Sequence, residues 1–264
     1  MKSFLKYHGG KARLARKIIS MMPDHNCYVE PFGGGAAVLL NKHRARLEVY
    51  NDLDGDVVAM FRVLRDRPDD LLRAVALTPF ARAEHEMSYE HCDDEVERAR
   101  RLLVRSHFGF GSSGIHRRTG FRAAGMRAGS LPVHFWEGFP AIVADTAKRM
   151  RSVVIECRPA VDVMKAHDAP GVVHYVDPPY LPETRGPGRD YRHEMSPEDH
   201  EALLDCLIGL KGNVVLSGYA SGMYDTILRD WRRVEFRAMA DRAMERVEVV
   251  WRNFEEPAPL FGVS

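Results

Sequence analysis

An acid, two prolines and an aromatic residue follow a short apolar run, Val172–Val176, in the order Asp177, Pro178, Pro179 and Tyr180. Proline fixes φ and has no backbone N–H, so the chain is stiff here and the carbonyls of Asp177 and Pro178 remain as acceptors. A carboxylate beside a carbonyl, with the ring of Tyr180 alongside, suits a planar group that carries an NH2. The same four residues could instead form only a rigid turn between a strand and a loop.

Three glycines at positions 33–35 follow a second strand-like run and precede a helical pattern. Glycine lets the backbone approach a ligand closely, and a helix N-terminus offers amide donors. About 20 residues later Asp52 and Asp54 end the next predicted strand, where α/β folds hold the hydroxyl pair of a ribose. The spacing differs from the GxGxxG of dinucleotide sites, and such a loop alone is often only a tight turn. Together with the acid, it indicates a ligand that contains adenosine.

The charge of the chain is unevenly distributed, although the formal net charge is only +1. No acid occurs between Arg98 and Ser130, and the middle of that window, residues 106–125, is rich in glycine and phenylalanine. Arginine pairs with phosphate or reads guanine edges, and aromatic rings stack or wedge between bases. A solvated basic loop is the alternative. The candidate DNA-binding residues are Arg105, Arg117, Arg118, Arg122 and Arg127.

The composition excludes several protein classes. The chain has 264 residues, 45% of them hydrophobic and 28% charged, so collagen-like, disordered and disulfide-rich classes are excluded. The cysteines, Cys27, Cys92, Cys157 and Cys206, form no CxxC pair, so we expect neither a structural zinc site nor a redox dithiol. No apolar run reaches the length of a membrane span, and the N-terminal residues lack the apolar block of a secretion signal. We therefore expect a cytoplasmic protein without membrane contact.

Short β-branched or aromatic runs alternate with helical patterns, which is typical of an α/β sheet. The predicted strands are 26–30, 47–51, 152–157, 172–177, 213–217 and 247–254, and helices are predicted over 11–22 and from an N-cap at Ser196 to about Leu210. Residues 57–147 break this rhythm with helical patterns at 57–64, 69–77 and 93–104 and then the basic loop. We interpret 57–147 as an insert, which leaves 1–56 and 148–264 as the sheet domain.

Four motifs in this order resemble the Dam-type family of adenine-specific DNA methyltransferases. They are KYHGGK at residues 6–11, VEPFGGGA at 29–36, NDLD at 51–54 and DPPY at 177–180. KYHGGK in isolation is typical of a fraying N-terminus, but it stands in front of the glycine loop. The resemblance implies a Rossmann-like sheet that binds S-adenosylmethionine, with one antiparallel strand near its C-terminal end, here 247–254. It also implies that 57–147 is a mainly helical target-recognition region that binds DNA.

The resemblance assigns roles to single residues. Asp52 would bind the ribose of the cofactor, Asp162 its adenine amino group, and Asp177 would lie between cofactor and target base. Residues 191–194 resemble the segment that closes over the base. The predicted catalytic residues are Asp177, Pro178 and Tyr180, and the predicted cofactor-binding residues are Tyr7, Lys11, Glu30, Phe32, Gly33, Gly35, Asp52, Asp162 and Asp177.

The implied activity is methyl transfer from S-adenosylmethionine to N6 of an adenine flipped out of double-stranded DNA, with neither a covalent enzyme intermediate nor a metal. A monomer or weak dimer is expected, in a bacterial cell or from a virus that acts in one, with a cognate restriction endonuclease as a candidate partner. The stretch 118–122 lacks the asparagines of the family's RxNxxGxFN pattern. The DNA sequence recognised is therefore not predicted.

Other activities stay open. Cytosine N4, RNA bases and protein glutamine also present an NH2 on an sp2 carbon, although KYHGGK and the long insert favour adenine in DNA. A catalytically silent DNA-binding relative belongs to a different class, and the intact Asp177, Tyr180 and glycine loop argue against it. A dinucleotide-dependent oxidoreductase is disfavoured because GxGxxG is missing.

Overall fold

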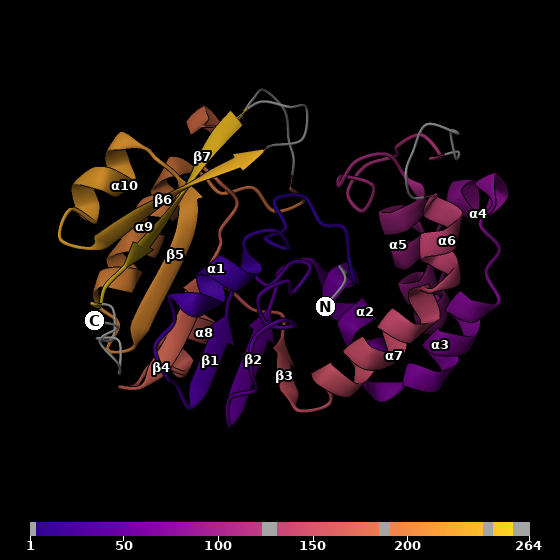
Figure 1. Ribbon diagram of the computed structural model, residues 1–264, viewed down its shortest axis with the longest axis horizontal. Coiled ribbons are helices and arrows are strands. Elements are labelled where there is room, and N and C mark those ends of the chain that lie inside the picture. Colours follow the sequence, from indigo (N-terminus) through magenta and orange to yellow (C-terminus); the bar gives the residue numbers. More distant parts are fainter. Residues whose placement is uncertain (1–3, 123–130, 185–190, 240–244, 256–264) are drawn as a thin grey trace, which may run out of the picture.

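A seven-stranded sheet in the order β3-β2-β1-β4-β5-β7-β6 lies beside a cluster of helices (Figure 1). The structure is a computed structural model and describes residues 4–122, 131–184, 191–239 and 245–255. The strands are β1 (Cys27–Glu30), β2 (Leu47–Asn51), β3 (Val153–Glu156), β4 (Val172–Val176), β5 (Asn213–Tyr219), β6 (Arg232–Met239) and β7 (Glu245–Arg252). β1 to β5 pair in parallel, whereas β7 is antiparallel to β5 and to β6. The predicted α/β class and the antiparallel strand near the C-terminal end are confirmed.

Strand β6 is present in the structure but was not predicted from the sequence. Its first residues alternate exposed Arg233 and Glu235 with half-buried Val234 and Phe236, and few of them are apolar. β6 is the edge strand and is paired only with β7 in the order of the sheet. An edge strand buries little apolar surface, so its signal in the sequence is weak.

Helices cover both faces of the sheet. Leu216 of β5 packs in one core cluster with residues of α8 (Ala160–Ala166), α9 (Pro197–Ile208) and α10 (Gly222–Ile227), and Val215 packs in another with α1 (Ala15–Ser20). Successive residues of a strand point to opposite faces, so these clusters lie on either side. The predicted cap of α9 is confirmed, since the side chains of Ser196 and Asp199 each accept a hydrogen bond from the other's amide.

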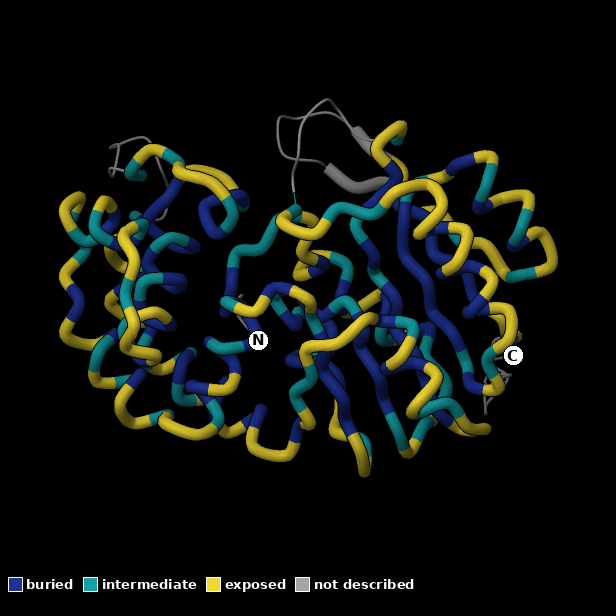
Figure 2. Tube along the Cα trace, turned by 180° about the vertical axis from the view of Figure 1, so that it is seen from behind, coloured by how far each residue is buried: buried dark blue, intermediate teal, exposed yellow. Residues whose placement is uncertain are grey.

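A helical cluster lies between β2 and β3 in the chain (Figures 1 and 2). One core cluster joins Tyr50 of β2 to Phe61 and Phe139 of these helices, and the ring of Phe4 lies 5.8 and 6.0 Å from those two phenylalanine rings. The helices are therefore packed onto the sheet by a continuous apolar core. The predicted ends of the insert, 57 and 147, fall inside helices. Its described helices are α2 (Gly55–Asp66), α3 (Pro68–Ala76), α4 (Arg82–Met87), α5 (Glu95–Phe108), α6 (Pro132–Glu137) and α7 (Phe139–Met150).

The glycine segment after β1 does not lead into the helix that the sequence pattern predicts. Residues 33–42 form successive turns, with φ of +45° at Gly34 and +53° at Ala36. These left-handed conformations interrupt helical geometry. The amide of Leu39 donates to the carboxyl group of Glu30 at 3.0 Å instead of to a helical carbonyl. The amide donors at this edge of the sheet therefore come from turns.

Candidate active site

A pocket of about 320 Å³ opens at the carboxyl edge of the parallel strands. Open α/β sheets bind ligands at this edge, and small-molecule sites commonly measure about 300–1,000 Å³. Segments far apart in the sequence converge here, and each of the four predicted motifs contributes residues to the lining. The lining includes residues 7–11, 30–35, 52–54, 159–161 and 191–195 together with Asp177 and Pro179.

The glycine turn is held against the end of β2 by backbone and side-chain hydrogen bonds. The amide of Gly34 donates to Asp52 Oδ2 at 2.7 Å, and the hydroxyl of Tyr50 donates to the Gly34 carbonyl at 2.8 Å. A Cβ on Gly33 would overlap the ring of Tyr50, so a larger residue does not fit there. The glycines thus bring backbone directly to the wall of the pocket.

Two acids that line the pocket, Asp52 and Glu30, differ in their protonation state. Burial raises the pKa of Asp52 to about 6, although the amides of Gly34 and Asp54 donate to its carboxylate. Burial raises the pKa of Glu30 to about 8, and the hydrogen bond from the Tyr28 hydroxyl at 2.6 Å only partly offsets it. At neutral pH Asp52 is mostly a carboxylate and an acceptor for hydroxyl groups, whereas Glu30 is mostly protonated.

Asp177, which follows β4, is fixed by donors from three segments. Lys11 Nζ lies 2.9 Å from Asp177 Oδ1, the Ser217 hydroxyl donates to the same oxygen at 2.8 Å, and the Tyr180 hydroxyl lies 3.3 Å from it. Burial opposes the charge of Lys11, but the carboxylates of Asp177 and Glu248 outweigh it and raise the pKa of the lysine. The position of the Asp177 carboxylate is therefore determined by its neighbours before any ligand binds.

Tyr180 lies behind the pocket and not in its wall. The side chain is only 5% exposed, its ring lies 4.8 Å from Lys11 Nζ, and its centroid is 4.5 Å from that of Tyr219 in an edge-to-face arrangement. Pro178 is buried as well, whereas Pro179 is part of the lining. Of the three predicted catalytic residues, the structure brings Asp177 to the pocket and packs the other two next to it.

Glu248 of β7 belongs to the same cluster and is missing from the predicted site. The Tyr180 hydroxyl donates to Glu248 Oε2 at 2.7 Å, and Lys11 Nζ lies 3.9 Å from Oε1. One signal was present in the sequence, because Glu248 is an acid inside an otherwise apolar strand pattern. A buried acid in such a strand usually has a partner for its charge.

The segment 191–195 forms one wall of the pocket. Arg192 Nη1 bonds Asp54 Oδ1 at 2.8 Å and Asp56 Oδ2 at 2.9 Å, at the N-terminus of α2. The segment is therefore tied to the start of α2, and closure over a ligand remains the role that the sequence predicts for it.

Comparison with known protein families agrees with this geometry. The profile of the D12 class of N6 adenine-specific DNA methyltransferases matches residues 7–239. The chain belongs to this family. The match begins in the KYHGGK motif and runs through the pocket and the insert to the end of β6.

Several bacterial proteins are similar to this D12-class chain. The DNA adenine methylases of Salmonella typhi and of Escherichia coli K12 are each 28% identical over 193 residues, which is 69% of this chain and 66% of theirs. The chain thus spans slightly less than two thirds of their length. A Type II methyltransferase of Lactococcus lactis subsp. cremoris is 26% identical over 254 residues, 88% of this chain and 86% of that protein.

All predicted cofactor-binding residues line the pocket except Asp162. Asp162 is exposed in the first turn of α8, and its neighbours Ala160 and Val161 supply the wall instead. Adjacent residues of a helix point in different directions, and the turn that brings Val161 inward directs Asp162 outward. The structure therefore does not support a cofactor contact at Asp162.

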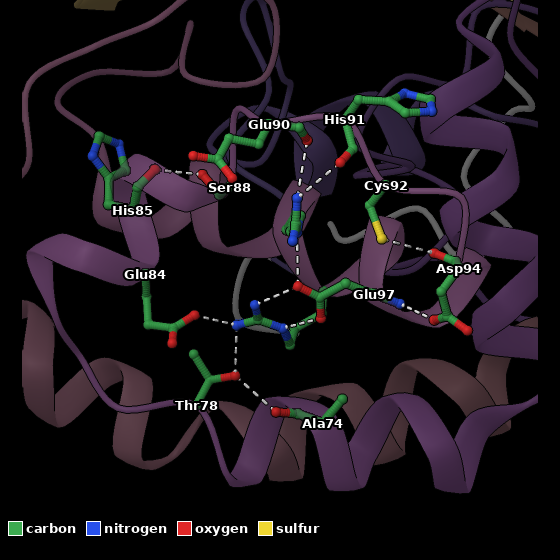
Figure 3. A network of polar contacts seen from close by, with 12 residues as sticks. Ala74, Thr78, Glu84, His85, Ser88, Glu90, His91, Cys92, Asp94 and Glu97 are labelled. Atoms are coloured by element: carbon green, nitrogen blue, oxygen red, sulfur yellow. Dashed lines mark hydrogen bonds and ion pairs between the residues drawn. The ribbon is translucent and has the colours of Figure 1, made fainter.

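Three arginines of the acid-free window are paired with acids that lie outside it in the sequence. Arg100 binds Glu97 and Glu84 at 2.6 and 2.7 Å, Arg101 binds Glu97 at 2.7 Å, and Arg98 binds an acid of α2 at 2.7 Å. Figure 3 shows Glu84 and Glu97 in this network. These arginines join helices of the insert, so the basic charge available for a partner is smaller than the sequence window indicates.

The predicted DNA-binding arginines differ in exposure. Arg117 and Arg118 are exposed on the glycine-rich loop, whereas Arg105 and Arg122 are half-buried. Burial lowers the pKa of Arg105. Arg127 lies outside the described residues. In the described part of this loop, positive charge therefore reaches the surface chiefly at Arg117 and Arg118.

The described residues contain no group of three or more His, Cys, Asp or Glu that could hold a metal ion. In the same parts of the chain, no helix is long and apolar enough to cross a lipid bilayer.

Proposed function

We propose that the chain transfers a methyl group from S-adenosylmethionine to the exocyclic N6 of adenine in double-stranded DNA. The observation that carries this proposal is the Asp177 carboxylate at the pocket. Among the described contacts, Lys11, Ser217 and Tyr180 all approach Oδ1. This pattern leaves Oδ2 as an acceptor for an amino group, and the family supports adenine as its carrier.

The residues of the pocket fit S-adenosylmethionine. Asp52, which follows β2, is a mostly ionised acceptor that suits the two hydroxyls of a ribose, and the glycine turn offers backbone to the methionine part. Tyr7, Lys11 and Phe32 complete the wall at the positions that the motifs assign to the cofactor. When bound, S-adenosylmethionine supplies an electrophilic methyl group on a sulfonium.

The amino nitrogen of adenine is a poor nucleophile because its lone pair is delocalised into the ring. Hydrogen bonds from its two hydrogens to the Asp177 carboxylate and the Pro178 carbonyl would pyramidalise the nitrogen and direct its lone pair at the methyl group. The N–C bond then forms as the S–C bond breaks, the electron pair stays on sulfur, and the nitrogen releases one proton to water. The protein contributes positioning and fixed dipoles to this step.

The target amino group takes part in base pairing, so the base must be flipped out of the duplex at a cost of a few kcal/mol. The insert is the proposed source of compensating contacts. Arg117 and Arg118 are exposed for phosphate, and Phe110, which is 58% exposed on the same loop, can fill or distort the duplex. We place the reaction in the bacterial cytoplasm, and the Type II relative makes a restriction endonuclease a candidate partner.

Incubation with unmethylated duplex and labelled S-adenosylmethionine tests the proposal. Nucleoside analysis should give N6-methyladenine, and sequencing of modified positions should give the recognition site. Asp177→Ala should abolish transfer and leave duplex binding largely intact, because the residue lies in the pocket and not on the exposed basic loop. Transfer at the wild-type rate in that variant, or label in cytosine or only in RNA, would refute the proposed mechanism or substrate.

A further inference from the structure

Glu248 reaches the active edge of the sheet because β7 runs antiparallel. The parallel strands present their carboxyl ends at this edge, whereas an antiparallel strand presents its N-terminal end. Glu248 is the fourth residue of β7 and lies opposite Tyr219 in the ladder with β5. The antiparallel direction of β7 therefore places Glu248 near Asp177, although the two residues are distant in the sequence.

The contacts of Glu248 go to residues of the active site. The Tyr180 hydroxyl donates to Oε2 at 2.7 Å, shorter than its 3.3 Å distance to Asp177 Oδ1. Lys11 Nζ lies between the two acids, 2.9 Å from Asp177 and 3.9 Å from Glu248. The Glu248 side chain is only 11% exposed, so these interactions are weakly screened by water.

We propose that Glu248 is a positioning residue for methyl transfer, which holds the Tyr180 hydroxyl away from Asp177 and shares the charge of Lys11. The inference rests on the proposed function of the same site. Without Glu248, the Tyr180 hydroxyl would turn to Asp177 Oδ1, which already accepts from Ser217, and the charge of Lys11 would act on Asp177 alone. The carboxylate would rotate or lose charge density, and the Tyr180 ring would lose the contact that fixes its angle.

The competing explanation is that Glu248 only stabilises the pairing of β7 with β5. A structural role of this kind would lower stability and the concentration of folded enzyme without changing the rate constant per folded molecule. A positioning role would lower kcat and leave KM for both substrates nearly unchanged, because the short contact of Glu248 is with Tyr180 behind the pocket, and Lys11 keeps its 2.9 Å contact with Asp177.

The test compares kcat and KM for methylation by Glu248→Ala, Glu248→Gln, Tyr180→Phe and the double variant Glu248→Ala with Tyr180→Phe. A hydrogen bond to a charged group corresponds to about a 10- to 100-fold change in rate. We expect a loss of that size in kcat for Glu248→Ala and for Tyr180→Phe, and no larger loss in the double variant. Glu248→Gln keeps a carbonyl acceptor for the hydroxyl and should stay within about fivefold of wild type.

Glu235→Ala is the matched control, because it removes an exposed acid from the neighbouring strand β6. Its kcat should equal that of wild type, and thermal unfolding of each variant gives the fraction of folded enzyme. Wild-type kcat in Glu248→Ala, additive losses in the double variant, or equal losses in the Gln and Ala variants would each overturn the inference. A wild-type protein that leaves adenine unmethylated would instead refute the proposed function, so the two failures are distinguishable.

Discussion

Replacing Arg117 and Arg118 by glutamine should weaken binding to double-stranded DNA and make it less dependent on salt. Both side chains are exposed on the glycine-rich loop of the insert. Each phosphate that a cation neutralises adds about 0.9 to the slope of log K against log of the salt concentration. If each arginine contacts one phosphate, the slope should fall by about 1.8 in the double variant. Between about 50 and 200 mM salt, the affinity advantage of wild type should then shrink about 12-fold.

Fluorescence anisotropy of a labelled duplex at four salt concentrations measures this slope. Arg101→Gln is the matched control, because it removes an arginine of the same acid-free window. Its guanidinium binds Glu97 at 2.7 Å and the Glu90 carbonyl at 3.0 Å inside the protein. The control should lower the thermal stability and leave the salt slope at the wild-type value.

A wild-type salt slope in the double variant would contradict this prediction and would show that the glycine-rich loop is a solvated surface. The prediction would also be contradicted if Arg101→Gln lowered the salt slope by as much per arginine removed as the double variant does. That result would mean that the arginines of the window act alike, whatever their partners in the folded chain.

Two further predictions concern the pocket. The free energy of unfolding without ligand should fall as the pH rises from about 4.5 to about 8, because the folded-state pKa of Glu30, about 8, exceeds its ordinary value of 4.5 and the native state binds the proton more tightly. Urea unfolding should show a flatter pH dependence in Glu30→Gln, and an unchanged slope would contradict this assignment. Arg192→Ala should weaken S-adenosylmethionine binding about fivefold in calorimetry, because half-exposed pairs with Asp54 and Asp56 contribute about 1 kcal/mol. Arg65→Ala, a surface control, should bind as wild type does, and equal affinity in both variants would show that Arg192 does not hold the pocket closed.

The parts of the site that could be predicted from the sequence are those in which one residue type dictates the local backbone. Two prolines after Asp177 stiffen the chain, and Gly33 is required because any side chain would meet Tyr50. Such requirements act within a few residues, so a short motif shows them. The strands β1 to β5 were predictable for a similar reason, since buried parallel strands are continuous apolar runs.

The errors share a non-local origin. The helix expected after the glycines gives way to turns because Gly34 and Ala36 adopt positive φ and Glu30, nine residues from Leu39, binds the Leu39 amide. Asp162 faces outward because the position of α8 on the sheet directs Val161 to the pocket. In neither case does the local pattern contain the partner that determines the outcome.

The charge of the acid-free window also depends on residues that are distant in the sequence. The acid-free window has a high positive charge only along the sequence. In the fold, Glu84, Glu97 and an acid of α2 pair with arginines of α5, the first helix of that window. Glu248 is the opposite case, an acid on an antiparallel strand. The sheet places its carboxylate 2.7 Å from the hydroxyl of Tyr180, which lies 68 residues earlier in the chain. The motifs that contain Lys11 and Tyr180 were visible in the sequence, but Glu248, which accepts a hydrogen bond from the Tyr180 hydroxyl, belongs to no motif. The orientation of Asp177 therefore depends on the register of β7 as much as on the motif that contains it.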